Sequence, residues 1–87
     1  MEKIYLVTEH SKGEGYDDVR NFAYSTKIKA LDKMQALIDA AKEDMGIDEN
    51  TIEHFEICDN ADSWECYDNC SYDEMRIDLT ILVVDED

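Results

Sequence analysis

The chain contains no proline and only three glycines among its 87 residues. This scarcity excludes a low-complexity linker, and an apolar fraction of 44% is typical of a folded protein. The longest apolar run, residues 81–84, is far too short to span a membrane. The first residues lack the basic segment and apolar stretch of a signal peptide. We therefore expect a single domain, residues 1–87, that lies in the cytoplasm and does not contact membranes.

Basic residues are nearly absent from the second half. Through residue 42, seven acids accompany seven bases, whereas from residue 43 onward 16 acids accompany one base, Arg76. The whole net charge of −15 therefore belongs to the second half. Such a chain repels nucleic acids and anionic membranes, so we expect no direct binding to either. Its charge suits contact with a basic protein surface that normally binds phosphate.

Cysteine is scarce as well. Three cysteines, an odd number, without an export signal indicate reduced thiols. His54, Cys58, Cys66 and Cys70 form the pattern His-x3-Cys-x7-Cys-x3-Cys, and four such ligands would suit tetrahedral zinc. The paired Cys-x2-Cys of common zinc modules is missing, however. We expect ordinary, partly buried thiols and no metal or other cofactor, with a metal-stapled loop as the alternative.

Catalytic signals are weak. The chain has only two histidines, His10 and His54, and no nucleophile elbow, phosphate loop or dinucleotide fingerprint. His54 and Cys58 would share a strand face, but four strand residues separate them by about 13 Å, too far for a hydrogen bond. We expect that the protein is not an enzyme.

The first half predicts two strands and a helix. Residues 3–9 are rich in β-branched and aromatic side chains and predict a strand. Residues 10–18 contain two glycines and predict a polar loop, and residues 19–24 predict a short strand with bulk on both faces. Residues 26–45 predict a helix that Ser25 or Thr26 caps and Gly46 ends. Its apolar stripe contains Ile28, Leu31, Met34, Leu37 or Ile38, Ala41 and Met45.

The second half predicts two further strands. Residues 52–58 place Phe55 and Ile57 on one apolar face, and residues 59–73 predict a long acidic loop with room for a short strand around Trp64. Residues 74–84 alternate well and end apolar on both faces, which predicts a central strand. The expected fold class is α+β: an antiparallel sheet of about four strands with one helix packed on one face, in the order ββαββ.

Three short motifs in the first half resemble those of known proteins. They are Ile4-Tyr5-Leu6-Val7-Thr8-Glu9-His10, Gly15-Tyr16-Asp17-Asp18, and Phe22-Ala23-Tyr24-Ser25-Thr26-Lys27 with Lys29-Ala30. Together they resemble a group of small uncharacterised phage and prophage proteins, over about the first half of the chain. That resemblance implies a mobile-element origin and a role in conflict between phage and host. In composition alone, the whole chain resembles acidic DNA-mimic inhibitors of the anti-CRISPR type.

Carboxylates and aromatic residues are interleaved in the second half. The acids Glu53, Glu56, Asp59, Asp62, Glu65, Asp68, Asp73, Glu74 and Asp78 are candidates to replace a row of phosphates. Alternate residues on a strand lie about 6.6 Å apart, close to the spacing of successive phosphates on a nucleic-acid strand. Trp64, Tyr67 and Tyr72 lie among these acids and would supply contact area at an interface. The alternatives are a solvated acidic surface and, for Trp64, an anchor in the core.

These observations lead to one functional hypothesis. The protein is expected to be a small phage-type inhibitor that blocks the nucleic-acid groove of a basic protein, such as a CRISPR effector, by phosphate mimicry. The candidate contact residues are Glu53, Glu56, Asp59, Asp62, Trp64, Glu65, Tyr67, Asp68, Asp73 and Glu74. The alternatives are a phage accessory or structural protein whose acidity serves solubility, and a small metal-stapled adaptor. Neither the identity of the partner nor the oligomeric state follows from the sequence.

Overall fold

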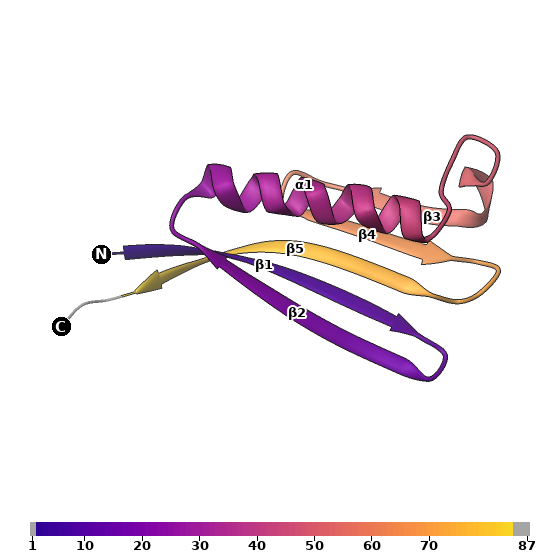
Figure 1. Ribbon diagram of the computed structural model, residues 1–87, viewed down its shortest axis with the longest axis horizontal. Coiled ribbons are helices and arrows are strands. Elements are labelled where there is room, and N and C mark those ends of the chain that lie inside the picture. The colour runs from indigo at the N-terminus through magenta and orange to yellow at the C-terminus, as the bar shows by residue number, and fades with distance from the viewer. Residues whose placement is uncertain (1, 85–87) are drawn as a thin grey trace.

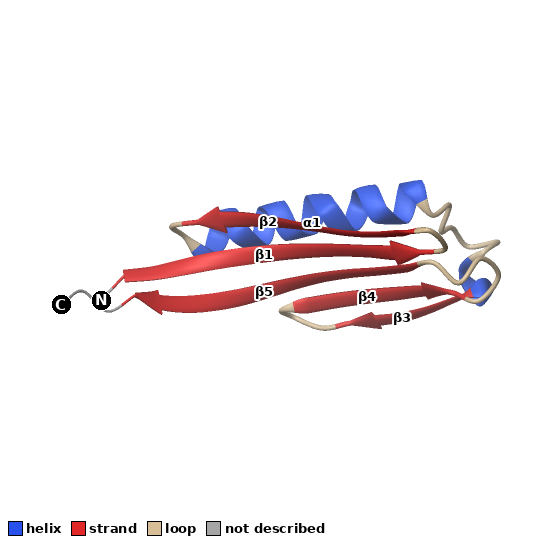
Figure 2. Cartoon of the chain, turned by 90° about the horizontal axis from the view of Figure 1, so that it is seen from below, coloured by secondary structure: helices blue, strands red, loops and turns tan. Residues whose placement is uncertain are grey.

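A computed structural model describes residues 2–84 and shows one helix packed on a twisted antiparallel sheet (Figure 1). The elements in chain order are β1 (Glu2–Gly13), β2 (Tyr16–Tyr24), α1 (Lys27–Asp44), the 3-10 turn η1 (Ile52–His54), β3 (Phe55–Asp59), β4 (Ser63–Asp68) and β5 (Glu74–Val84). The strand order across the sheet is β2-β1-β5-β4-β3, and α1 covers one face (Figure 2). The molecule is elongated, with extents of 51 × 27 × 16 Å.

The α+β class and the single covering helix are confirmed, but the predicted number of strands is too low. The sheet has five strands and the element order is ββαβββ. The additional strand, β4, lies inside the predicted acidic loop. It forms there because Trp64 and Cys66 alternate with exposed Glu65, so that one side of the segment is apolar although the other is charged.

The predicted loop at residues 10–18 is also wrong. β1 continues to Gly13 and β2 begins at Tyr16, so that only Glu14 and Gly15 form the turn. Gly15, the second of these two residues, has φ +84, the positive φ that a type II turn requires at this position and that glycine adopts without strain. The polar residues of this segment therefore belong to a long exposed hairpin rather than to a loop.

The helix forms where its spacing and its caps predict it. Thr26 is the N-cap, and its Oγ1 accepts a hydrogen bond from the Lys29 amide at 3.4 Å. Gly46 follows the helix with φ +69. Ile28 is 75% exposed, contrary to the predicted stripe, because the buried face begins only at Ala30. The buried core consists of Val7, Ala30, Met34, Leu37, Ile38, Ala41, Trp64, Cys66 and Ile77.

No helix of residues 2–84 covers the other face of the sheet, which is called the open face below. Successive strand residues alternate between the two faces, so the open face follows from the register. It carries Ile4, Leu6, Thr8, His10 and Lys12 of β1, Asp17, Val19, Asn21 and Ala23 of β2, Glu56 and Cys58 of β3, Ser63, Glu65 and Tyr67 of β4, and Glu74, Arg76, Asp78, Thr80, Leu82 and Val84 of β5.

The predicted central position of residues 74–84 is confirmed for β5. The apolar end of this strand is nevertheless exposed, because β4 pairs with β5 only from Glu74 to Asp78. On its other side β5 pairs with β1 as far as Val84.

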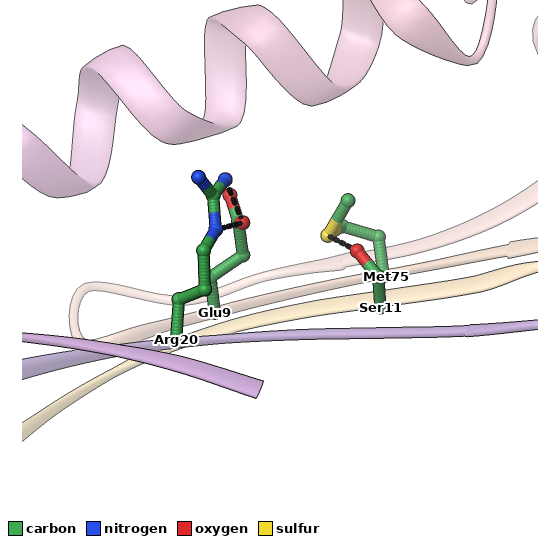
Figure 3. A network of polar contacts seen from close by, with 4 residues as sticks. All are labelled: Glu9, Ser11, Arg20 and Met75. Carbon is green, nitrogen blue, oxygen red and sulfur yellow. Dashed lines mark hydrogen bonds and ion pairs between the residues drawn. The ribbon is translucent and has the colours of Figure 1, made fainter. Parts of the chain in front are cut away.

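One carboxylate lies on the helix side of the sheet. Glu9 is 7% exposed, and the Nε of Arg20 on the neighbouring strand β2 donates a hydrogen bond to its Oε1 at 2.8 Å (Figure 3). Two residues further along β1, Ser11 Oγ donates to the Met75 sulfur at 3.3 Å. Arg20 therefore neutralises a charge that the fold removes from water.

Candidate partner-binding surface

Four of the predicted contact residues meet on the open face. Glu56, Glu65, Tyr67 and Glu74 line a groove of about 590 Å³ that crosses β1, β5, β4 and β3. The groove is also lined by His10, Lys12, Cys58 and Arg76. It brings together side chains from both halves of the chain, which the sequence pattern did not predict.

The charges in this groove are partly compensated. Arg76 Nε lies 3.2 Å from Glu65 Oε1 and 2.8 Å from Asp78 Oδ2. His10 Nε2 lies 2.5 Å from Asp17 Oδ1. Arg76 is the sole lysine or arginine of residues 43–87, so no acid of residues 43–84 other than Glu65 and Asp78 forms an ion pair with a lysine or arginine of that half. The groove itself is a mixed-charge surface.

The acids do not form a single row along a strand. They recur every third residue, whereas the two faces of a strand alternate every second residue. Glu56 and Glu65 therefore lie on the open face, and Asp59 and Asp68 lie on the helix side. The acids of β3 and β4 are therefore divided between the two faces of the sheet.

A different set of acids gathers at one end of the molecule. This acid end consists of Glu43, Asp44, Asp48, Glu49, Glu53, Asp68, Asp73 and Glu74, from the C-terminal turn of α1, the α1–β3 connection and the β4–β5 turn (Figure 1). Asp44, Asp68, Asp73 and Glu74 line a hollow of about 340 Å³ together with Ser11, Tyr16, Met45 and Met75. No basic side chain is among these lining residues.

Hydrogen bonds within the turns hold the acid end in place. The Asn69 amide donates to the His54 carbonyl at 2.9 Å and joins the β4–β5 turn to η1. Asp68 Oδ1 accepts from the Cys70 and Ser71 amides, at 2.8 and 3.3 Å. Asp48 Oδ1 accepts from the Asn50 and Thr51 amides in the same manner. These two acids therefore organise backbone turns, which is a structural role in addition to their charge.

Two pKa shifts reflect this environment. The hydrogen bond from the Cys70 amide, followed by those from Ser71, lowers the pKa of Asp68, which keeps its carboxylate ionised at neutral pH. Burial, followed by the charge of Asp73, its hydrogen bond and the charge of Asp18, raises the pKa of the Tyr16 hydroxyl. Tyr16 therefore stays a neutral donor beside the acid end.

The remaining predicted contact residues are dispersed. Glu53 is exposed in η1, and Asp59 and Asp62 are exposed around the β3–β4 turn. Trp64 is completely buried on the helix side of β4, so its side chain anchors the core and offers no surface to a partner. Among the aromatic candidates, Tyr67 and Tyr72 remain accessible, and their ring centroids lie 6.5 Å apart.

The predicted alternative of a metal staple does not fit the arrangement of the cysteines. Cys66 is buried on the helix side, whereas Cys58 is exposed on the open face. Within residues 2–84, no group of three or more histidine, cysteine or acidic side chains is placed to hold a metal ion. The sulfur atoms of Cys58 and Cys66 lie on opposite faces of one sheet and therefore cannot share an ion.

Sequence reasoning missed half of the acid end. Glu43, Asp44, Asp48 and Glu49 were not among the candidate residues, although they open the stretch of residues 43–75 that contains no lysine or arginine. This stretch without lysine or arginine was the signal in the sequence that could have identified these four acids. The sequence pattern could not show that the end of α1 and the β4–β5 turn, two segments that lie far apart in the chain, line one hollow.

Comparison of the chain with models of known protein families, with curated proteins and with solved structures found no match. Among the helices of the described residues, none has the length and apolar character needed to cross a membrane.

Proposed function

We propose that this protein binds the nucleic-acid groove of a basic protein through its acid end and excludes nucleic acid from that groove. The proposal rests mainly on one observation: four carboxylates, from the end of α1 and from the β4–β5 turn with its flanking residues, line a common hollow that no basic side chain of residues 2–84 lines. Like charges brought together in this way destabilise a fold, which favours an interpretation in which they serve binding.

The binding mode differs from a linear phosphate row. The acid end would enter a basic cleft end-on, and its carboxylates would accept hydrogen bonds from lysine and arginine side chains, with arginine able to bind in bidentate fashion. Tyr72, which is 70% exposed in the β4–β5 turn, would add apolar contact next to the charges. Long-range attraction between the charges would accelerate association at low salt.

The class of partner follows from this chemistry and from the phage-like motifs of the first half. We propose a host defence or regulatory protein that binds DNA or RNA, such as a CRISPR effector, a restriction enzyme or a transcription factor. Inhibition would be competitive, because inhibitor and nucleic acid would need the same basic side chains.

Two quadruple variants of equal charge test the location of the site. The first neutralises exposed acids of the acid end: Asp44→Asn, Glu49→Gln, Glu53→Gln and Glu74→Gln. The second neutralises exposed acids elsewhere: Glu2→Gln, Asp32→Asn, Asp59→Asn and Asp62→Asn. Each changes the net charge from −15 to −11. None of the eight side chains makes a hydrogen bond or ion pair within residues 2–84, so both variants should fold.

The assay immobilises each protein, applies a bacterial lysate at low salt and elutes with DNA or RNA. We expect the wild type and the second variant to retain a nucleic-acid-binding protein that nucleic acid displaces, and the first variant to lose it. Equal retention by both variants would indicate general ion exchange and would leave solubility as the role of the acids. No retention by the wild type would also contradict the proposal. The fluorescence of the single, buried Trp64 reports whether each variant is folded.

A further inference from the structure

The second half of β5 has a neighbouring strand on only one side. The pairing with β4 ends at Ser63 and Asp78, and the Leu79 amide donates to the Asp62 carbonyl at 2.8 Å. On the opposite side the pairing with β1 continues to Glu2 and Val84. Within residues 2–84, β5 from Thr80 to Val84 is therefore an open sheet edge, five residues long (Figure 2).

The direction of the Leu79 amide identifies which backbone groups are free. In a strand the amide and carbonyl of one residue point to the same side, and successive residues point to opposite sides. Because the Leu79 amide points away from β1, those of Ile81 and Val83 do too. Two amides and two carbonyls thus face outward along this edge, where no described strand pairs with them.

The side chains along the edge are apolar on both faces. Ile81 and Val83 are 48% and 53% exposed on the helix side, and Leu82 and Val84 are 44% and 38% exposed on the open face. The edge lacks the lysine, proline or bulge with which proteins usually prevent strand addition.

Helix α1 carries two exposed apolar residues on the side that faces away from β2. Lys33 Nζ lies 4.3 Å from the centre of the Phe22 ring on β2, which fixes the side of α1 that faces β2. Leu31 lies two positions earlier, about 200° away around the helix, and therefore on the side that faces away from β2. Ile28, one turn before Leu31, shares that side and is 75% exposed.

We propose that this edge is a dimerisation site, at which β5 pairs antiparallel with β5 of a second copy about a two-fold axis at Leu82. Ile81 of each copy then lies opposite Val83 of the other, and the outward amides and carbonyls form four hydrogen bonds. Val84 of the second copy lies opposite Thr80. The next position toward β4, opposite Leu79, is already occupied by Asp62 of the same copy. Residues 80–84 of the second copy therefore pair along the full length of the open edge, which is residues 80–84 of the first copy.

Charge restricts the orientation in which a second copy can bind at this edge. The acid end lies at the start of β5, at the opposite end of the long axis from Val84 (Figure 1). Antiparallel pairing directs the two acid ends in opposite directions, so that two chains of charge −15 repel each other less than they would in parallel pairing. An isologous two-fold contact also closes the edge of both copies at once and produces no further polymer.

A disulfide experiment tests the register. Leu82 would lie directly opposite its own counterpart, in a non-hydrogen-bonded pair with a Cα separation of about 4.5 Å, which suits a disulfide. In a Cys58→Ser, Cys70→Ser background, Leu82→Cys should form a covalent dimer on mild oxidation. Val84→Cys is the matched control on the same face, since its counterpart would lie about 13 Å away. Equal cross-linking of both variants, or none of Leu82→Cys, would overturn the proposal.

Sedimentation measurements test dimerisation without oxidation. The wild type should show a concentration-dependent monomer–dimer equilibrium, and Ile81→Lys with Val83→Lys should weaken it about tenfold or more. Val19→Lys with Ile52→Lys is the control, because it makes the same charge change at residues of similar exposure. Both variants lower the net negative charge, so loss of the dimer in the first cannot be caused by a larger net charge on each chain. A wild type that stays monomeric up to about 1 mM, or that forms larger species, would contradict the proposal.

Discussion

Replacing Arg20 with methionine should destabilise the fold because Glu9 would then be buried without a partner. Glu9 is 7% exposed, and Arg20 donates to its Oε1 from Nε and Nη2. A buried polar group that loses its partner costs about 1–3 kcal/mol, more when it is charged. The side chain of Arg20 is 62% exposed, so water can partly replace the lost guanidinium group. The range for a polar group therefore applies, and not the larger cost of an isolated buried charge. We expect a loss of about 1–3 kcal/mol in the free energy of unfolding.

A double-mutant cycle isolates the contribution of this pair. Glu9→Leu with Arg20→Met removes both charges, and its stability should lie within about 1 kcal/mol of the wild type, because a buried ion pair is often replaced by apolar residues without loss. The coupling energy between the two positions should be about 1–2 kcal/mol. Urea unfolding followed by Trp64 fluorescence measures all four proteins.

The control for this cycle is Lys12→Met, which makes the same charge change on the open face of β1. Measurements at about 0.5 M salt suppress the general effect of charge, because the Debye length falls below about 5 Å. If Arg20→Met is no more destabilising than Lys12→Met, or if the coupling energy is near zero, Arg20 does not stabilise the buried carboxylate.

The remaining predictions concern charge and thiols. The exposed Cys58 and Cys70 thiols should react with a thiol reagent in the native protein at pH 8. Burial, followed by the charge of Asp68, raises the pKa of the Cys66 thiol to about 11, so Cys66 should react only after unfolding. The thiol of the unfolded chain has a pKa of about 8.5, so ionisation of Cys66 favours the unfolded state at high pH. The free energy of unfolding should therefore fall as pH rises from about 9 to 11, and this fall should be smaller in Cys66→Ala. Lys27→Glu should raise stability by about 0.3–1 kcal/mol, since the first turn of α1 has no acid, and Lys33→Glu should lower it by removing the contact with Phe22. The melting temperature should rise between very low and moderate sodium chloride, because salt screens repulsion within the acid end, and a flat curve would show that these acids are well separated.

The parts of the fold that the sequence predicts have strong local signals. The helix has both a cap at Thr26 and a glycine after its end, and residues 74–84 alternate without interruption, so both appear with nearly the predicted bounds. The sequence analysis left room for a short strand around Trp64 but did not count it among the strands, because Glu65 and Asp68 obscure the apolar alternation of Trp64 and Cys66 in β4. Propensity weighs all side chains of a segment equally, whereas a half-exposed strand needs only one apolar face.

The candidate site could be predicted in composition but not in shape. The lack of lysine and arginine over residues 43–75 correctly indicates where negative charge is concentrated. That Asp44 and Asp73 line the same hollow depends on how α1 lies across the sheet, which is a property of tertiary packing. The burial of Trp64 depends in the same way on which face of β4 the helix covers.

The position of β5 in the sheet has a consequence for the order of folding. The hairpins β1–β2 and β3–β4 can each form from neighbouring residues, but they have no pairing with each other, and only β5 joins them. An isolated two-stranded hairpin is marginally stable, so neither should persist until β5 docks between them. The pairing of Glu2 with Val84 closes nearly the whole described chain into one loop, and such non-local contacts slow folding. The rate-limiting step should therefore be the insertion of β5, and substitutions in the middle of this strand should slow refolding more than equally destabilising substitutions in the β1–β2 turn.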